Sequence, residues 1–287
     1  MQSSDMSKFP VFVMCGGDYP RRKLLEDIDP EQRYKTKALL PFLGKRLIDW
    51  QLEELAKSEF VEGLYLLGLS EADAQFDFLV HYVPVETISD FSDKLLEGLD
   101  YLENLGKSTE LIVVSSCDAP GIRVEEIDAF FKLLMATEGY EFYLSLVPED
   151  VIEAEFPGSG RVVARFADGN VIPGELYALS PRAIRIQQDV IKELGNRRRQ
   201  INRHAQKVTM GPVLRFVGQR PQTWFLLLKY LLGIARLDSA ELAVSRAFDC
   251  RTKGLLISHA GFGMDMDLPE DYERLQTYVQ KIKVDKA

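Results

Sequence analysis

Short runs of apolar residues alternate along the chain with longer segments in which apolar residues recur every three or four positions. The first pattern is typical of buried strands, and the second is typical of helices with one buried face. In the first half, strands are predicted at Phe9–Met14, Leu64–Leu67, Leu79–Val83 and Leu111–Val114, and helices at Lys45–Ser58 and about Asp90–Leu105. This alternation predicts an α/β fold in which helices wrap a largely parallel sheet.

The pattern changes beyond Pro148 and then returns to the style of the first half. A hairpin is predicted from Arg161–Phe166 and Glu175–Leu179, with its turn at Asp168-Gly169. Two strands follow at Leu255–Ile257 and Gly261–Asp267, and a closing helix at Pro269–Ile282. Proline near the first position of a helix supports the start of the last element. We therefore expect one domain over residues 1–287, with residues 148–250 as an insertion.

Composition and charge exclude several classes of protein. Of the 287 residues, 46% are hydrophobic and 28% are charged, which is ordinary for a globular chain and argues against disorder. The 44 acidic and 35 basic side chains give a net charge of −9, which argues against a nucleic-acid partner. The three cysteines, Cys15, Cys117 and Cys250, are odd in number and far apart, so they favour neither a disulfide framework nor a CxxC site. We expect a cytoplasmic protein.

No segment predicts membrane insertion or secretion. The start of the chain lacks the basic and then apolar pattern of a signal peptide. The most apolar window, Trp224–Leu237, is interrupted by Lys229 and is shorter than the roughly 20 residues that a transmembrane helix needs. Core packing and a homodimer surface through residues 221–237 are the two favoured interpretations of this window, ahead of a lipid contact.

Glycines and basic residues follow the first predicted strand. Gly16 and Gly17 end it, and a charged stretch then leads to Lys37; its cations include Arg21, Arg22 and Lys23. Glycines let backbone amides approach a ligand, and amides with Arg and Lys suit phosphate oxygens. By itself, a glycine pair after a strand is more often a plain turn.

Acidic residues stand at two places where a ligand could bind. Asp118 follows the apolar strand Leu111–Val114, so its carboxylate could bind Mg²⁺, although it could also serve as a turn or cap before Pro120. In an extended Gly261–Asp267, Asp265 and Asp267 would share one face and repel each other unless a cation lay between them. Asp267 could instead be the N-cap of the last helix.

Taken together, these motifs resemble the MobA-like nucleotidyltransferases. The resemblance covers about residues 9–135 and 255–282, and it is carried by Lys37-Ala-Leu-Leu-Pro41, Gly44-Lys-Arg-Leu-Ile48, Cys117-Asp-Ala-Pro120 and Asp265-Met-Asp-Leu-Pro-Glu-Asp271. That family implies a GT-A-like (Rossmann-like) fold: a three-layer α/β/α arrangement with a mixed, mostly parallel sheet, here with an inserted β-hairpin and helical segment. It also implies transfer of a nucleoside monophosphate from an NTP to a phosphorylated small-molecule acceptor, with release of pyrophosphate.

The resemblance also implies a role for each matching residue. These are triphosphate binding by Gly16, Gly17, Arg21 and Arg22; neutralisation of phosphate charge by Lys37; binding of Mg²⁺, or Mn²⁺, by Asp118 with Asp265 or Asp267; nucleobase contact by Ser92; and acceptor contact, within residues 148–250, by Gly174 and Glu175. The chemistry is then positioning and charge stabilisation without a protein nucleophile.

Two alternatives stay open. A GT-A glycosyltransferase would use a ready-made nucleotide sugar and usually carries two acids in a DxD motif, whereas Ser116-Cys117-Asp118 has one. A catalytically silent nucleotide-binding protein would account for the unusual charged loop Tyr19–Lys35, which replaces a shorter glycine-rich loop of the family.

Overall fold

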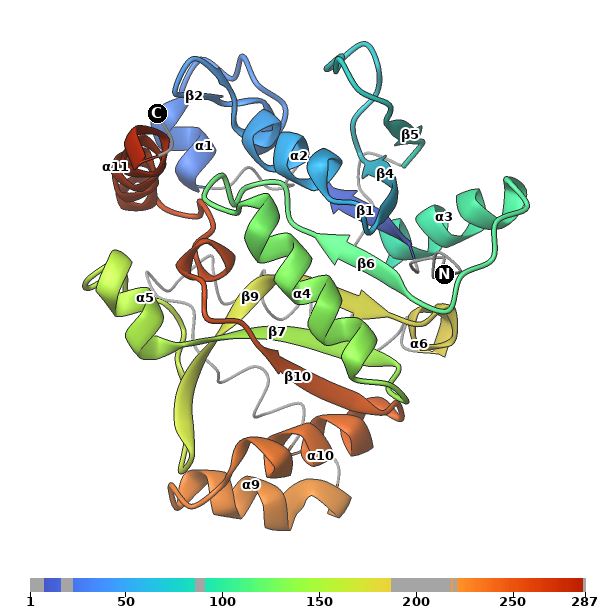
Figure 1. The fold of residues 1–287 in the computed structure, drawn as a ribbon, viewed down its shortest axis with the longest axis vertical. Helices are drawn as coiled ribbons and strands as arrows, with labels where there is room; N and C mark the ends of the chain where they lie inside the picture. Colours follow the sequence, from blue (N-terminus) through green and yellow to red (C-terminus); the bar gives the residue numbers. More distant parts are fainter. Residues whose placement is uncertain (1–7, 17–22, 86–90, 187–217, 219–220, 286–287) are drawn as a thin grey trace, which may run out of the picture.

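One mixed sheet connects the two halves of the chain (Figure 1). The computed structural model describes residues 8–16, 23–85, 91–186, 218 and 221–285. Within them the sheet has eight strands, in the order β10 (Thr252–Leu256), β7 (Phe142–Pro148), β9 (Gly169–Leu179), β6 (Ile112–Ser115), β1 (Phe9–Met14), β4 (Val61–Leu67) and β5 (His81–Val83), with β8 (Ala164–Phe166) paired to β9.

The centre of the sheet is built from parallel strands. Strand β1 lies between β4 and β6 and is parallel to both, and every residue from Phe9 to Val13 is buried. A continuous apolar run of this kind is typical of strands covered on both faces. Strand β9 is antiparallel to β6 and to β7, and it thereby attaches β7 and β10 to the parallel half.

Helices cover both faces of the sheet, and successive side chains of β1 point alternately into the two cores that result. Val11 and Val13 belong to a core with α2 (Leu47–Lys57), α4 (Val124–Ala136) and α11 (Pro269–Asp285). Phe12 belongs to a second core with α3 (Phe91–Asn104) and α6 (Pro181–Ile186). The predicted three-layer α/β/α arrangement with a mixed, mostly parallel sheet is therefore confirmed.

The remaining elements connect and flank these layers. They are α1 (Lys23–Ile28), the 3₁₀ helix η1 (Lys37–Leu39), the β2–β3 pair (Pro41–Phe42, Lys45–Arg46), α5 (Glu149–Glu155), η2 (Pro221–Thr223), α9 (Trp224–Leu231), α10 (Leu237–Phe248) and η3 (Ala260–Gly263). No helix among the described residues combines the length and the apolar character needed to cross a bilayer.

Most predicted elements are confirmed, with two differences. The hairpin exists, with Phe166 opposite Gly169, and the closing helix starts at Pro269. The strand predicted at Gly261–Asp267 is wrong: its first residues form η3, and the rest of the segment has no partner strand. Strand β7 was not among the predicted strands, although it pairs with both β9 and β10. The single-domain organisation remains a prediction.

Candidate active site

The carboxyl ends of β1 and β6 lie side by side because the two strands are parallel neighbours in register, with Val13 opposite Ser115. Ligands of open α/β sheets usually bind at such ends. The loop after β1 begins with Cys15 and Gly16, and the loop after β6 carries Asp118. Thr36 donates a hydrogen bond to the Cys15 carbonyl (3.1 Å) and accepts one from Ala38 N (3.4 Å), which holds η1 against the end of β1.

Lys37, the first residue of η1, lies between two carboxylates. Its Nζ contacts the Asp118 carboxylate and lies 2.7 Å from Asp267 Oδ1, and it donates to the Met266 carbonyl at 3.2 Å. The exposed fractions of the Lys37, Asp118 and Asp267 side chains are 8%, 4% and 20%. The lysine charge is therefore largely desolvated and fixed in place by the acids around it.

A third and a fourth acid complete the cluster. Carboxylate oxygens of Asp118, Glu175 and Asp265 all lie within 4.8 Å of one another. Burial raises the pKa of Glu175 well above its usual range, and the charges of Asp265 and Asp118 raise it further. Burial also raises the pKa of Asp265 to about 6, with Asp267 adding to the effect. So many carboxylates close together favour a cation, and an oxygen-only ligand set suits Mg²⁺.

Arg161 also contacts the cluster, and the sequence analysis did not identify it. Its guanidinium contacts both the carboxylate and the carbonyl of Asp265, and it lies 3.3 Å from Asp271 Oδ2. The arginine also reaches the Met264 sulfur at 3.1 Å. Arg161 thereby fixes the segment that carries Asp265, and it offsets part of the negative charge there.

The segment Met264–Asp267 keeps the predicted alternation without forming a strand. Met264 and Met266 are fully buried, while Asp265 and Asp267 lie on the side of the acidic cluster. The carboxylate that accepts from the backbone N–H groups of Leu268 (2.9 Å) and Asp267 (3.2 Å) at the start of α11 is that of Asp271. The side chain of Asp271 therefore caps the start of α11, and the side chain of Asp267 contacts Lys37.

Lys94 of α3 is a second cation that sequence reasoning missed. A Cβ added to Gly16 would lie 2.0 Å from Lys94 Nζ, so the ammonium rests directly on this glycine. Gly68, with a φ of +105°, also packs on Gly16, since a Cβ there would lie 2.5 Å from Gly16 Cα. The glycine after β1 is thus required by two close contacts, and a positive charge covers the loop that it begins.

Comparison of the sequence with protein-family models and with curated proteins found no match. The structure resembles a hypothetical transferase from Thermus thermophilus (TM-score 0.64, 23% identity, 92% of this chain and 99% of that one). It also resembles CMP:2-keto-3-deoxy-manno-octonic acid synthetase complexed with CTP (TM-score 0.53, 13% identity, 96% and 99%). A third similar structure is 4-diphosphocytidyl-2C-methyl-D-erythritol synthase from Anaerococcus prevotii (TM-score 0.50, 12% identity, 96% and 100%).

The chain has the fold of these nucleotidyltransferases. The likeness extends over 92–96% of this chain and over nearly the whole length of each compared structure. Membership of the MobA-like family within this fold remains a prediction.

The nucleotidyltransferase fold brings five of the predicted site residues together: Lys37, Asp118, Glu175, Asp265 and Asp267. Gly16 borders them through the adjoining loop. Ser92 is 2% exposed, and its hydroxyl has no hydrogen-bond partner among the described residues. At Gly174 a Cβ would lie 2.4 Å from Ser145 Oγ, which explains the glycine by strand packing. The remaining predicted residues, Gly17, Arg21 and Arg22, lie outside the described residues.

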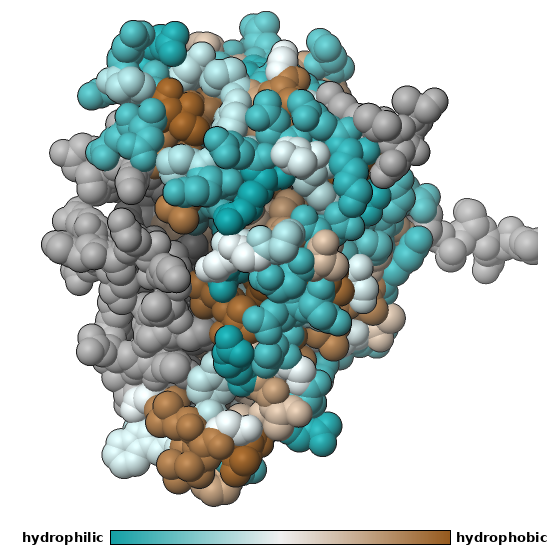
Figure 2. Space-filling model, turned by 90° about the vertical axis from the view of Figure 1, so that its left-hand side faces the viewer, coloured by the Kyte–Doolittle hydropathy of each residue, from teal (hydrophilic) through white to brown (hydrophobic). Residues whose placement is uncertain are grey.

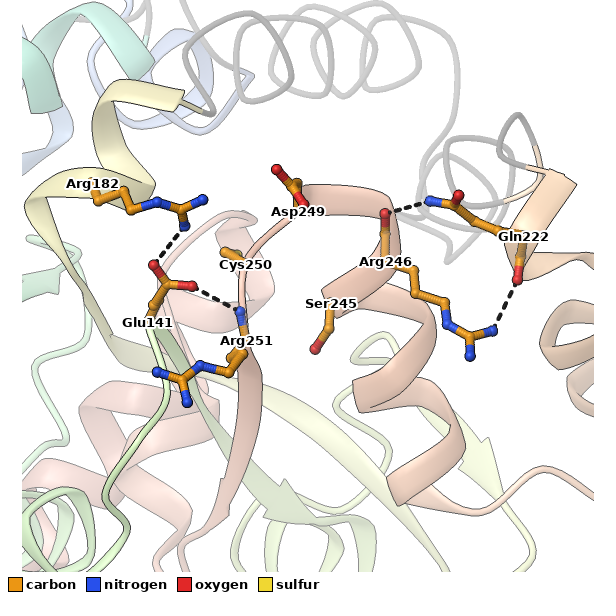
Figure 3. A pocket seen from close by; sticks show the side chains of 8 residues that line it. All are labelled: Glu141, Arg182, Gln222, Ser245, Arg246, Asp249, Cys250 and Arg251. Atoms are coloured by element: carbon orange, nitrogen blue, oxygen red, sulfur yellow. Dashed lines mark hydrogen bonds and ion pairs between the residues drawn. The ribbon is translucent and has the colours of Figure 1, made fainter.

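A cavity of about 570 Å³ lies elsewhere, beside α10 and the start of β10 (Figure 3). Several of its polar groups contact one another: Glu141 accepts from the Arg182 side chain (2.6 Å) and from the Arg251 backbone (3.2 Å), and Arg246 donates to the Gln222 carbonyl (3.1 Å). The arginines in Figure 3 point in different directions and do not converge on one point. None of the predicted site residues lines this cavity, so the acidic cluster is the better candidate.

Proposed function

We propose that this chain is a metal-dependent nucleotidyltransferase that transfers a nucleoside monophosphate from an NTP to the phosphate of a small-molecule acceptor. The observation that carries the proposal is Lys37, a buried cation in contact with Asp118 and Asp267 beside the loop after β1. A fixed cation and adjacent metal-binding oxygens are what stabilisation of a reacting phosphate requires. The likeness to a synthetase complexed with CTP supports an NTP as the donor.

The donor set fits a divalent cation. Asp118, with Asp265 or Asp267, would hold Mg²⁺, or Mn²⁺, and Glu175 is close enough to share in this or to face the acceptor. When bound, the ion would neutralise negative charge on the phosphates. The pKa values of Asp265 and Glu175 are raised first by burial and then by the neighbouring carboxylates, so a bound cation would favour the ionised form of both.

The cations of the chain would position the phosphates. Lys37 is held before any substrate arrives, so little reorganisation is needed when charge develops at the α-phosphate. Lys94 and the backbone at Gly16 would bind the triphosphate, in company with the predicted Gly17, Arg21 and Arg22. An oxygen of the acceptor phosphate attacks the α-phosphorus, and the bond to the β-phosphate oxygen breaks, so pyrophosphate leaves. The acceptor phosphate is already ionised, so no protein nucleophile or base is required.

The proposal is tested by measuring pyrophosphate release with each of the four NTPs, Mg²⁺ and a panel of sugar and alcohol phosphates. Pyrophosphate should appear with one matched pair, and Asp118→Asn should lower the rate by roughly a hundredfold or more. As a control, Asp77→Asn removes an exposed acid that is not part of the acidic cluster, and it should leave the rate unchanged.

Other outcomes would support the alternatives. If an NTP raised the melting temperature and no acceptor gave pyrophosphate, a catalytically silent binding protein would account for the result. If a nucleotide sugar gave a nucleoside diphosphate, the chain would be a glycosyltransferase. If no nucleotide of either kind changed the melting temperature with Mg²⁺ present, the proposal would fail.

A further inference from the structure

Helix α9 turns an apolar face away from the protein. The exposed side chains on α9 and the turn after it are large and apolar, with exposed fractions between 52% and 68%: Trp224, Phe225, Leu228, Leu231, Leu232 and Ile234. Leu226 is the one buried side chain of the helix, at 8% exposed. A surface helix normally directs its apolar face inward, so this arrangement is reversed.

The orientation of this face is fixed by packing on the inner side. At about 100° per residue, the four exposed apolar side chains within the helix fall in an arc of roughly 120°, with Leu226 on the opposite side. Leu226 packs with Ala243 and Ala247 of α10. On the same inner side, the Tyr230 ring lies 5.7 Å from the Phe166 ring of β8. The apolar face is therefore held outward by the fold.

The face is large enough for a stable contact. Figure 2 shows brown, hydrophobic atoms gathered at the lower end of the molecule, where Figure 1 places α9. Two of the six side chains are aromatic and four are aliphatic, and each is exposed by more than half, so together they present roughly 600 Å². That is near the upper limit of the apolar patches on monomers. It also approaches the roughly 800 Å² that each partner gives to a standard interface.

We propose that the α9 face docks on the same face of a second copy of this chain and forms a homodimer. Across a two-fold axis an apolar patch meets itself, so no complementary charges are needed, and homodimer interfaces are more apolar than other contacts. The one lysine of the helix, Lys229, lies over the Phe225 ring at 4.8 Å from its centroid. Its ammonium can thus remain at the rim. The net charge of −9 opposes the main alternative, adsorption on an anionic membrane.

The test is the molecular mass in solution, measured by sedimentation equilibrium from about 0.1 to 100 μM. The protein should be a dimer, and the double variant Leu228→Glu, Leu231→Glu should be a monomer, with self-association weakened at least a hundredfold. Leu79→Glu is the matched control, because Leu79 is 81% exposed and lies in a different part of the chain. This control should remain dimeric. Unchanged circular dichroism of the double variant shows that the charge acts at the interface and not on folding.

Two results would overturn the proposal. One is a wild-type protein that stays monomeric at every concentration, or a double variant that still dimerises. The other is a monomer that cosediments with vesicles of phosphatidylcholine, or of phosphatidylcholine with phosphatidylglycerol, and loses this binding in the double variant. That second result would assign the α9 face to a lipid surface.

Discussion

Replacing Lys37 with methionine tests how charge is balanced at the candidate site. Methionine keeps most of the length of the side chain and removes the cation between Asp118 and Asp267. Because the side chains of Lys37 and Asp118 are 8% and 4% exposed, water cannot take over the role of the lysine. Breaking a buried ion pair by removing one partner costs about 3–5 kcal/mol. We expect Lys37→Met to lower the free energy of unfolding by about 3 kcal/mol or more at pH 7.5.

A double-mutant cycle separates the pair from its surroundings. Asp118→Asn alone leaves Lys37 with Asp267, whereas Lys37→Met with Asp118→Asn removes both charges of the pair. Replacing both members of a buried pair is often neutral, so the double variant should be more stable than Lys37→Met alone by about 2 kcal/mol. Urea unfolding followed by circular dichroism, in EDTA and in Mg²⁺, measures these values. Mg²⁺ should restore part of the loss in Lys37→Met because it replaces the missing cation.

Additive costs in the cycle, or a loss below about 1 kcal/mol for Lys37→Met, would contradict a buried ion pair at this site. Either result would mean that the lysine and the carboxylates are solvated in solution. The acidic cluster would then have no preorganised cation.

Two further predictions concern a buried acid and the lysine on the glycine loop. Burial raises the pKa of Glu126 from 4.5 to about 7 although Arg123 opposes the shift, so ionisation of Glu126 destabilises the fold as pH rises through that interval. Glu126→Gln should therefore raise the free energy of unfolding by up to about 3 kcal/mol at pH 8, and it should have no effect below pH 4.5. Urea unfolding at a series of pH values measures this difference. A gain in stability that does not depend on pH would contradict the prediction. Lys94→Met should raise KM for the NTP about tenfold with a smaller effect on kcat. The control Lys132→Met, at an exposed lysine, should change neither parameter. A fall in kcat as large as the rise in KM would show that Lys94 does not act in binding.

The local sequence was sufficient to predict a strand where that strand is buried on both faces. The continuous apolar runs at Phe9–Met14 and Leu111–Val114 predicted β1 and, within a residue at each end, β6. At Gly261–Asp267 the two aspartates do share one side, as the alternation predicted, and yet no strand forms. A strand needs a neighbouring strand with free backbone groups, and local sequence does not contain that information.

The same limit applies to the candidate site. Lys37, Asp118, Asp265 and Asp267 were proposed from motifs, and the structure brings them together. The contact between Arg161 and Asp265 spans 104 residues and follows no motif, so only the fold reveals it. Lys94 was missed for the same reason, although Ser92 on the same helix was singled out.

The apolar window Trp224–Leu237 shows a third kind of limit. Its composition was compatible with a core and with a surface, since both need large apolar side chains. Only the positions of α10 and β8 reveal that α9 buries Leu226 and exposes Trp224, Phe225, Leu228 and Leu231.

The most direct test of nucleotidyl transfer uses a radioactively labelled NTP donor and measures which product carries the label. Once the matching NTP and acceptor are found, the reaction is run in parallel with NTP labelled with ³²P at the α-phosphate or at the γ-phosphate. We predict that the α-label appears in the acceptor product and that the γ-label leaves entirely as pyrophosphate, in a one-to-one ratio with product. Transfer of the γ-label to the acceptor, or release of a nucleoside diphosphate, would contradict the assignment of the acidic cluster and Lys37 to attack at the α-phosphorus.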